Sequence, residues 1–395
     1  MLSIVSALVA APFIALLCYF SLELLLGLRP LSTTDKSGKS NSLIVLIPAH
    51  NEGVSIAGTV SHLLDSGFPE TARVLVVADN CSDDTARIAR DAGAEAIERH
   101  HATERGKGYA LAFGRDHIRD SGYDADTILV VDADCRITGR DAAKVADAVA
   151  TTGQIYQIRN LLSSNAGDPP LVQISTFAML VKNLVRARGL QRLGGGIPLF
   201  GTGMAFPWRV FEVAALATGN VVEDMQLALD LARDGTRVRL FEGATVTSLP
   251  AKGDAFQEQR SRWEHGFIQT ATKHALPLVA DGVSAPSRHL LGLGLHLLVP
   301  PLALLLALST IAIAVTGALT IFGANPLPFV ILAVALVVAL LLVLAAWWME
   351  GRDAMRPAAL LRAPLYVLWK IPLYLRYFTN RQRDWNRTRR DHELD

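Results

Sequence analysis

The sequence has little cysteine and almost no net charge. Its 395 residues include three cysteines, Cys18, Cys81 and Cys135, and no two of them are spaced as C-x-x-C. Neither a disulfide framework nor a zinc knuckle is therefore indicated. The formal net charge is only +1, which argues against a nucleic-acid partner. The chain also lacks repeats and low-complexity tracts, and "STTDKSGKSNS" is a short linker.

Two common nucleotide-binding motifs are missing. The segment "ERGKGYAL" contains Gly-Lys-Gly, but it lacks the preceding glycine and the following Ser or Thr of a P-loop. No G-x-G-x-x-G opens a helix after the first expected strand. The sequence therefore argues against a P-loop NTPase and against a dinucleotide-binding fold.

Long apolar runs are abundant. Hydrophobic residues make up 51% of the chain and the mean hydropathy is +0.30, which is too apolar for an ordinary soluble enzyme. The run from Leu2 to Leu28 carries Glu23 as its only charge and exceeds the ~20 residues that cross a bilayer. It lacks the initial positive charge of a signal peptide, so we expect a membrane helix. Two further runs, 290–314 and 328–348, predict a helical hairpin with "FGANPLP" as its turn.

Basic residues beside the expected spans predict the orientation of the chain. Arg29, Lys36 and Lys39 follow the first span, Arg288 precedes the second, and the C-terminal tail is rich in arginine. With three spans, all these segments lie on one side. We therefore expect the central domain and the C-terminus to lie in the cytoplasm, and the protein to be an integral protein of the bacterial inner (plasma) membrane. The amphipathic stretch 359–378 is expected to lie in the membrane interface, and a fourth crossing is the alternative.

The middle of the chain, between Asn41 and about Pro250, alternates apolar runs of strand length with helical stretches. Continuous apolar runs are typical of strands buried on both faces, and their alternation with helices predicts a parallel sheet covered on both sides. Ligands of such folds bind beyond the carboxyl ends of the strands. The expected strands are residues 43–47, 73–78, 127–131 and 154–158, and two of the expected helices are 83–94 and 108–120.

Polar clusters follow three of these strands: "PAHNE" (48–52), "DNCSDDT" (79–85) and "DADC" (132–135). An aspartate after a strand is usually a helix cap, as we expect for Asp83 or Asp84. Asp132 and Asp134, separated by one small residue, can direct both carboxylates toward one hard cation. Mg²⁺ or Mn²⁺ held by few carboxylates leaves coordination sites for phosphate oxygens. The alternative is a pair of turn aspartates without a metal.

Three further segments carry candidate residues. Lys107, between two glycines at an expected helix start, is suited to meet a diphosphate, or is a plain loop lysine. The glycines of "GTGMAFP" (201–207) let the backbone approach a ligand closely. Glu223 and Asp224 open a helix, where acidic residues are favoured by the helix dipole alone. The functional interpretation is that Asp224 is a general base facing an acceptor.

Taken in order with "QRSRW", these motifs resemble the membrane-bound family 2 glycosyltransferases, which include cellulose, hyaluronan and chitin-oligosaccharide synthases and ceramide glucosyltransferase. The resemblance covers about Leu43 to Gly266. It implies an α/β, GT-A-like, mostly parallel sheet domain in the cytoplasm, one N-terminal and about two C-terminal transmembrane helices, and interfacial helices. The expected segments are a transmembrane helix (1–29), the transferase domain (41–252), an interfacial helix with Q-x-x-R-W (253–286), a transmembrane hairpin (287–350), and an interfacial segment with a basic tail (351–395).

The resemblance also implies a role for each matching residue. Asp79 and the loop from Pro48 to Glu52 match the segment that holds the nucleotide base and ribose. Glu223 and Asp224 match a Thr-Glu-Asp motif in which Val222 replaces the threonine. The implied sets are catalytic, Asp224 and Glu223; donor-binding, Pro48, His50, Glu52, Asp79, Lys107, Asp132, Gln259 and Arg262; acceptor-binding, Trp263, Gly201, Thr202 and Gly203; and metal-binding, Asp134 and Asp132.

The implied activity is a metal-dependent, inverting transfer of a sugar from a UDP-sugar to a membrane lipid or lipid-linked glycan, in exopolysaccharide or glycolipid biosynthesis. The implied cofactor is Mg²⁺ or Mn²⁺. A processive polysaccharide synthase is the first alternative, because similar basic, tryptophan-containing tails occur in polysaccharide-making relatives. Three spans are few to enclose a polymer channel, which favours a single addition. A non-catalytic membrane scaffold with a nucleotide pocket is the remote alternative.

Overall fold

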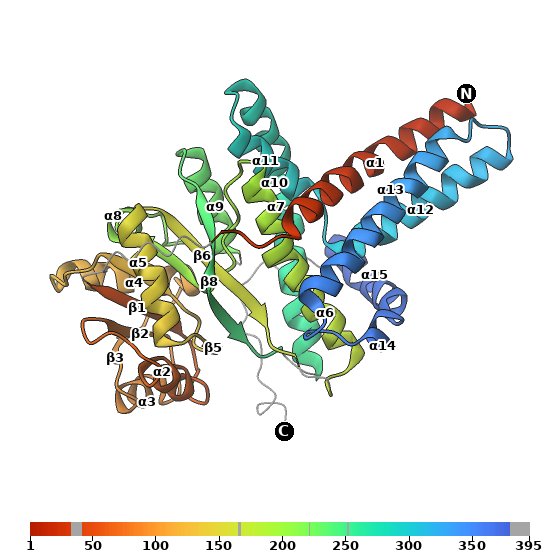
Figure 1. Ribbon diagram of the computed structural model, residues 1–395. Helices are drawn as coiled ribbons and strands as arrows, with labels where there is room; N and C mark the ends of the chain where they lie inside the picture. Colours follow the sequence, from red (N-terminus) through yellow and green to blue (C-terminus); the bar gives the residue numbers. More distant parts are fainter. Residues whose placement is uncertain (33–41, 165–166, 221, 251–252, 380–395) are drawn as a thin grey trace. The chain divides into compact units, whose positions relative to one another are not determined.

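The computed structural model of the chain describes residues 1–32, 42–164, 167–220, 222–250 and 253–379 (Figure 1). The chain divides into two compact units, and neither is continuous in sequence. The helical unit comprises Met1–Pro30, Ser164–Gly195 and the described part of Arg260–Gln382. The sheet unit comprises the described parts of Leu31–Ser163 and Gly196–Gln259.

The sheet unit is built on one eight-stranded sheet with the strand order β3-β2-β1-β4-β7-β6-β8-β5. Four of the seven strand pairings are parallel, and three, between β4 and β7, β6 and β7, and β5 and β8, are antiparallel. The α/β class is therefore confirmed and the sheet is mixed. The strands are β1 (Leu43–Ala49), β2 (Arg73–Asp79), β3 (Glu95–Arg99), β4 (Thr127–Val130), β5 (Cys135–Arg136), β6 (Ile155–Leu162), β7 (Met204–Pro207) and β8 (Val238–Ser248).

Helices cover both faces of the sheet, which explains why its central strands are apolar throughout. Val45 and Ile47 belong to the core shared with α2 and α5. Leu46 points the other way, toward Gly114 of α4, where an added Cβ would lie only 2.7 Å from the leucine side chain. The helices of this unit are α2 (Ile56–Leu64), α3 (Thr85–Asp91), α4 (Lys107–Asp120), α5 (Gly139–Thr152), α8 (Trp208–Phe211) and α9 (Glu223–Arg233).

Three described helices are long and apolar enough to cross a membrane: α1 (Leu2–Gly27), α12 (Leu302–Ile321), and α13 (Leu327–Ala346) with its continuation η2 (Trp347–Gly351). The three pack side by side in the helical unit (Figure 1). The backbone N–H of Asn325, in the loop between α12 and α13, donates to Ser3 Oγ at 3.0 Å. The start of α1 and the turn of the hairpin therefore lie at the same end of the bundle.

The second apolar run forms two helices where the sequence predicts one span from 290 to 314. α11 (Arg288–Leu298) ends just before Pro300 and Pro301, and α12 begins after them. Proline cannot donate a helical hydrogen bond and disfavours helical geometry in the preceding residue, and Val299 is extended, with φ −74° and ψ 110°. The spanning helix therefore starts and ends later than the hydropathy alone predicts.

The single charge of α1, Glu23, is fully buried in the helical unit. Its two carboxylate oxygens lie 2.6 Å from Arg186 Nε and 2.7 Å from His296 Nδ1. Arg186 lies on η1 (Val181–Arg186), which connects α6 (Pro170–Leu180) to α7 (Ala187–Arg192). Gly189 permits the close approach of α7 to α1, because a Cβ there would lie 2.0 Å from the carbonyl oxygen of Glu23. A buried ion pair thus fixes the first membrane helix to the rest of its unit.

The remaining helices are α10 (Gly253–Ser284), α14 (Pro357–Leu360) and α15 (Ala363–Thr379). α15 is not among the described helices that are long and apolar enough to span. Leu365, Leu368 and Leu375 are exposed along one side of it, whereas Lys370 and Tyr374 are buried on the other and both contact Glu264 of α10. This amphipathic pattern is consistent with the expected interfacial position, which stays a prediction.

We expect Glu23→Ala to destabilise the protein by ~3–5 kcal/mol, because Arg186 would then be buried without its carboxylate. Thermal unfolding of the purified protein in detergent measures the effect. The control is Asp91→Ala. The side chain of Asp91 is 65% exposed and pairs with Arg87 at the surface, so its loss should cost about 1 kcal/mol or less. Equal changes in the two variants would contradict the interpretation.

Candidate active site

The loops after β1 and β2 are joined to each other. β1 and β2 are parallel, with Pro48 opposite Val77, so their carboxyl ends meet at the same edge. His50 Nδ1 lies 2.7 Å from the carbonyl oxygen of Asp79, and the backbone N–H of Glu52 donates to Thr85 Oγ1 at 2.8 Å. The residues expected to hold a nucleotide base and ribose therefore form one connected surface at the sheet edge.

Asp79 is held in place by an arginine that the sequence analysis did not identify. Its carboxylate oxygen Oδ1 accepts hydrogen bonds from Arg99 Nη1 at 2.7 Å and from Asn80 Nδ2 at 3.1 Å, and the ion pair is buried. Arg99 also donates to the carbonyl oxygen of Glu104 at 2.7 Å, and its guanidinium lies over the ring of Tyr109. Asp79 is thus fixed before any ligand arrives.

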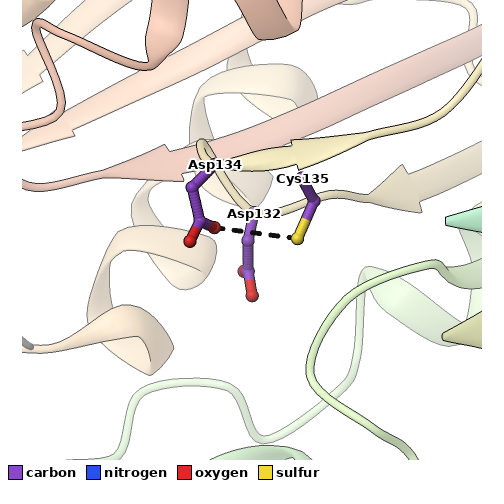
Figure 2. A group of neighbouring side chains, drawn as sticks. All are labelled: Asp132, Asp134 and Cys135. Carbon is purple, nitrogen blue, oxygen red and sulfur yellow. Dashed lines mark hydrogen bonds between the residues drawn. The ribbon is translucent and has the colours of Figure 1, made fainter. Parts of the chain in front are cut away.

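Asp132, Asp134 and Cys135 follow β4, and their possible ligand atoms all lie within 4.8 Å of one another (Figure 2). Burial and the two neighbouring carboxylates raise the pKa of the Cys135 thiol well above its usual value. The thiol therefore stays protonated, and it donates a weak hydrogen bond to Asp134 Oδ1 at 3.7 Å. The available donors are carboxylate oxygens, which suit Mg²⁺ or Mn²⁺ better than a thiolate-seeking metal.

Lys107 connects Asp132 to the glycine-rich loop, residues 200–203, which precedes β7. It begins α4, and its Nζ donates to Asp132 Oδ1 at 2.5 Å and to the carbonyl oxygen of Gly201 at 2.7 Å. Burial alone would lower the pKa of Lys107, but the charge of Asp132 and, when they are ionised, those of Glu223 and Asp224 more than offset this and raise it. Lys107 is therefore a fixed cation beside the first aspartate of the Asp-x-Asp pair.

In the glycine-rich loop, Gly201 lies beside Asp224 and Lys107, and Gly203 packs against the sheet. Gly201 has φ +82°, and an added Cβ would lie 3.4 Å from Asp224 Oδ2, so glycine keeps this space open. Thr202 Oγ1 accepts a hydrogen bond from the backbone N–H of Asp132 at 3.1 Å. A Cβ on Gly203 would instead lie 2.4 Å from the side chain of Ile158. Gly203, an expected acceptor-binding residue, therefore packs against the sheet.

Glu223 and Asp224 open α9 beside this cluster. Burial, and then the charge of Asp224, raise the pKa of Glu223 to about 8. Glu223 is therefore protonated at neutral pH, and the adjacent carboxyl groups do not both carry charge. A carboxyl group whose pKa is raised by burial and by a neighbouring carboxyl group is common in sites that move protons.

Gln259, Arg262 and Trp263 lie within about one turn of one another on α10. Arg260 lies on the same helix. Arg260 is only 5% exposed, and its guanidinium carbon lies 4.6 Å from the ring centroid of Trp263. Burial lowers the pKa of this guanidinium, and the cation stabilises the orientation of the tryptophan ring.

Two family profiles match the chain. "Glycosyl transferase family group 2" matches residues 127–349, which is more than half of the chain. "Glycosyl transferase family 2" matches residues 44–206. Together these ranges include the loops after β1, β2 and β4, the glycine-rich loop, and the start of α9.

Two curated proteins are similar in sequence. The uncharacterized glycosyltransferase YaiP of Escherichia coli (strain K12) is 27% identical over 240 residues, which cover 59% of this chain and 57% of that protein. Glycosyltransferase AglJ of Haloferax volcanii is 33% identical over 108 residues, which cover 27% of this chain and 32% of that protein. The chain thus spans less than two thirds of either relative.

Solved structures share the fold. The mannosyltransferase PcManGT from Pyrobaculum calidifontis, in complex with GDP-Man and Mn²⁺, gives a TM-score of 0.57 at 18% identity, covering 94% of this chain and 100% of that one. Glucosyl-3-phosphoglycerate synthase from Mycobacterium tuberculosis, in complex with Mn²⁺, UDP and phosphoglyceric acid, gives 0.40 at 15% identity, covering 62% and 83%. The first likeness confirms the expected GT-A-like fold with its added apolar helices.

We expect Asp134→Asn to weaken Mn²⁺ binding by about tenfold or more, because even changes next to a metal ligand commonly cost 10–100-fold. Titration of the purified protein with Mn²⁺, followed by electron paramagnetic resonance of the free ion, measures this. Asp120→Asn, at a carboxylate that is 72% exposed at the end of α4, is the control and should bind as the wild type does. Unchanged Mn²⁺ affinity in Asp134→Asn would remove this aspartate from the metal site.

Proposed function

This chain belongs to glycosyl transferase family group 2, and we propose that it transfers a sugar from a UDP-sugar to a membrane lipid or a lipid-linked glycan, with inversion at the anomeric carbon. One observation carries the proposal. Lys107 joins Asp132 to the carbonyl oxygen of Gly201, and Asp224 lies beside that glycine. Around the backbone of Gly201 thus lie the ammonium of Lys107, the carboxylate of Asp132 to which it is bonded, and the carboxylate of Asp224. Asp132 belongs to the aspartate pair that is suited to a metal.

The donor half of the site lies at the ends of β1, β2 and β4. His50, Glu52 and Asp79 are placed to hold the nucleoside, and Asp132 and Asp134 would hold Mg²⁺ or Mn²⁺. When bound, such an ion neutralises the negative charge of a diphosphate leaving group. The relative PcManGT holds GDP-Man and Mn²⁺ in its structure, which supports this assignment. Gln259 and Arg262 are assigned to the diphosphate by their match to the family motif.

The acceptor half of the site is assigned to Asp224, Gly201 and Thr202. Asp224 takes the proton from the acceptor hydroxyl as that oxygen attacks the anomeric carbon and the bond to the diphosphate breaks. A positioned carboxylate base typically contributes ~10²–10⁴ in rate. Glu223, protonated at neutral pH, avoids a second negative charge beside the base. One displacement converts an α-linked donor into a β-linked product.

The acceptor is proposed to arrive from the membrane. Three described helices are long and apolar enough to span a bilayer, and Trp263, with its ring against Arg260, offers a flat surface for a sugar or headgroup. Three spanning helices are few to enclose a growing polymer, which favours one addition over processive synthesis. We place the sheet unit on the cytoplasmic face of a bacterial inner membrane, where exopolysaccharide and glycolipid precursors are assembled.

The experiment that tests the function incubates detergent-solubilised protein and a native lipid extract with a panel of UDP- and GDP-sugars and Mg²⁺ or Mn²⁺. Mass spectrometry identifies the donor, the acceptor and the chain length, and NMR gives the anomeric configuration. We expect a lipid that carries one additional β-linked sugar. A ladder of long chains would establish the processive alternative, transfer from GDP-sugars alone would replace the donor, and an α-linkage from an α-linked donor would overturn the single displacement.

We expect Asp224→Asn to lower kcat by ~10²–10⁴, because the amide cannot accept the acceptor's proton. Binding of UDP, measured by calorimetry, should change by no more than about twofold, because the base does not contact the nucleotide. Asp230→Asn, further along α9 and 42% exposed, is the matched control and should turn over normally. Turnover by Asp224→Asn at the wild-type rate would refute the assignment of the base.

We expect the donor KM of the wild type to rise as pH increases through about 8. Glu223 is protonated below this pKa and loses its proton above it, which adds negative charge where a diphosphate must bind. Glu223→Gln stays neutral, so its donor KM should stay flat between about pH 7 and pH 9. Glu98→Gln, at an exposed carboxyl group on β3, should keep the wild-type profile. Parallel profiles in all three proteins would exclude Glu223 as the titrating group.

A further inference from the structure

A buried glutamine, Gln157, holds the backbone of the glycine-rich loop from the side of the sheet. It lies on β6 with 0% exposure. Its Oε1 accepts the N–H of Phe200 at 2.8 Å, and its Nε2 donates to the carbonyl oxygens of Thr202 at 2.8 Å and Gly203 at 3.2 Å. Nε2 also donates to the carbonyl oxygen of Ile158 at 3.0 Å, and the carbonyl oxygen of Gly203 accepts a second hydrogen bond from the N–H of Ile158 at 2.9 Å. One side-chain amide therefore bonds three backbone groups of a four-residue loop, at a buried position where unpaired polar groups are costly.

The same loop contacts the catalytic cluster on its other side. The carbonyl oxygen of Gly201 accepts a hydrogen bond from Lys107 Nζ at 2.7 Å, and Thr202 Oγ1 accepts one from the N–H of Asp132 at 3.1 Å. Gly201 and Gly203 both have positive φ, at +82° and +69°. Backbone in this region persists only when its surroundings fix it. On the β6 side the N–H of Ile158 donates to the carbonyl oxygen of Gly203 at 2.9 Å and Asn160 Nδ2 donates to that of Phe200 at 2.9 Å. Gln157 adds the contacts to the N–H of Phe200 and to the carbonyl oxygen of Thr202, the residues on either side of Gly201.

We propose that Gln157 is a positioning residue for sugar transfer, an inference that rests on the proposed function. Through the Phe200–Gly203 backbone, Gln157 sets the direction of the Gly201 carbonyl, and the carbonyl in turn keeps the Lys107 ammonium beside Asp132. It also keeps the open backbone of Gly201 next to Asp224. Gln157 touches neither donor nor acceptor, and it acts through the loop.

The chemistry of the amide explains why glutamine suits this position. It offers an acceptor and two donor hydrogens on one planar group, and the loop uses both functions. Methionine has nearly the same length but provides neither function. Glutamate keeps the acceptor and has a donor only while it is protonated, and burial raises the pKa of a carboxyl group. A glutamate here should therefore replace glutamine at low pH and fail as the pH rises.

The experiment compares Gln157→Met and Gln157→Glu with the wild type and with Gln154→Met, which makes the same change at an exposed glutamine just before β6. kcat, acceptor KM and the affinity for UDP are measured at about pH 6 and pH 8, below the unfolding temperature of each protein. We expect kcat of Gln157→Met to fall about 10–100-fold at both pH values, because displacement of a catalytic group by about 1 Å has effects of this size.

UDP affinity of Gln157→Met should fall much less than kcat does, because only the Lys107–Asp132 part of the proposed donor site contacts this loop and the nucleoside loops follow other strands. Gln157→Glu should lose several-fold more of its relative kcat at pH 8 than at pH 6, and Gln154→Met should match the wild type throughout. Unchanged kcat in Gln157→Met, or an equal loss of UDP affinity and kcat, would refute the positioning role of Gln157 and leave the proposed function standing. Absence of transfer by the wild type would overturn the proposed function, and this inference with it.

Discussion

The contact of Lys107 with Asp132 and Gly201 is the interaction on which the candidate site depends. Asp132, Glu223 and Asp224 bring three acidic groups to one small region, where like charges destabilise each other. The ammonium of Lys107, held between Asp132 and a carbonyl oxygen, offsets part of that repulsion. Protonation of Glu223 offsets more of it. The site therefore keeps carboxylates available for a cation and for a proton without an excess of negative charge.

Sheet topology explains how distant segments of the chain reach this site. β7 is antiparallel to β4, with Met204 opposite Val130, so the start of β7 lies at the end of β4. The glycine-rich loop, which precedes β7, is thereby brought to the aspartates that follow β4. In a fully parallel sheet, the residues before β7 would lie at the opposite edge. The departure from a parallel sheet is thus what brings the glycine-rich loop to the edge where β1, β2 and β4 end.

Much of the fold and part of the site could be predicted from the sequence, and the misses have physical reasons. The strands at 43–47, 73–78 and 127–131 are buried on both faces, so they appear in the sequence as unbroken apolar runs. The polar residues that follow them mark the candidate site. β3 and β8 alternate between buried and half-buried or exposed positions, so a search for unbroken apolar runs does not find them. Pro300 and Pro301 divide the second apolar run, which hydropathy alone does not register.

Arg99 and Gln157 could not be assigned from local pattern. Arg99 acts on Asp79, which lies 20 positions away, and Gln157 acts on Phe200, which lies 43 positions away. A side chain that works through another segment leaves no motif of its own in one sequence. Residues that contact a ligand directly occur together in short motifs, and residues that hold those motifs in place are known only once the chain is folded.

The burial of Glu23 has a consequence for the order in which the protein is made. α1 is synthesised before both partners of Glu23, because Arg186 and His296 follow more than 160 and 270 residues later. During that time the carboxyl group has neither partner, and an unpaired charge is costly inside a bilayer. Glu23 lies near the end of α1 and not at its centre, where an unpaired charge in a spanning helix costs most. The sheet unit is largely synthesised in this interval, so α1 completes its packing in the bundle only after most of the sheet unit has been made.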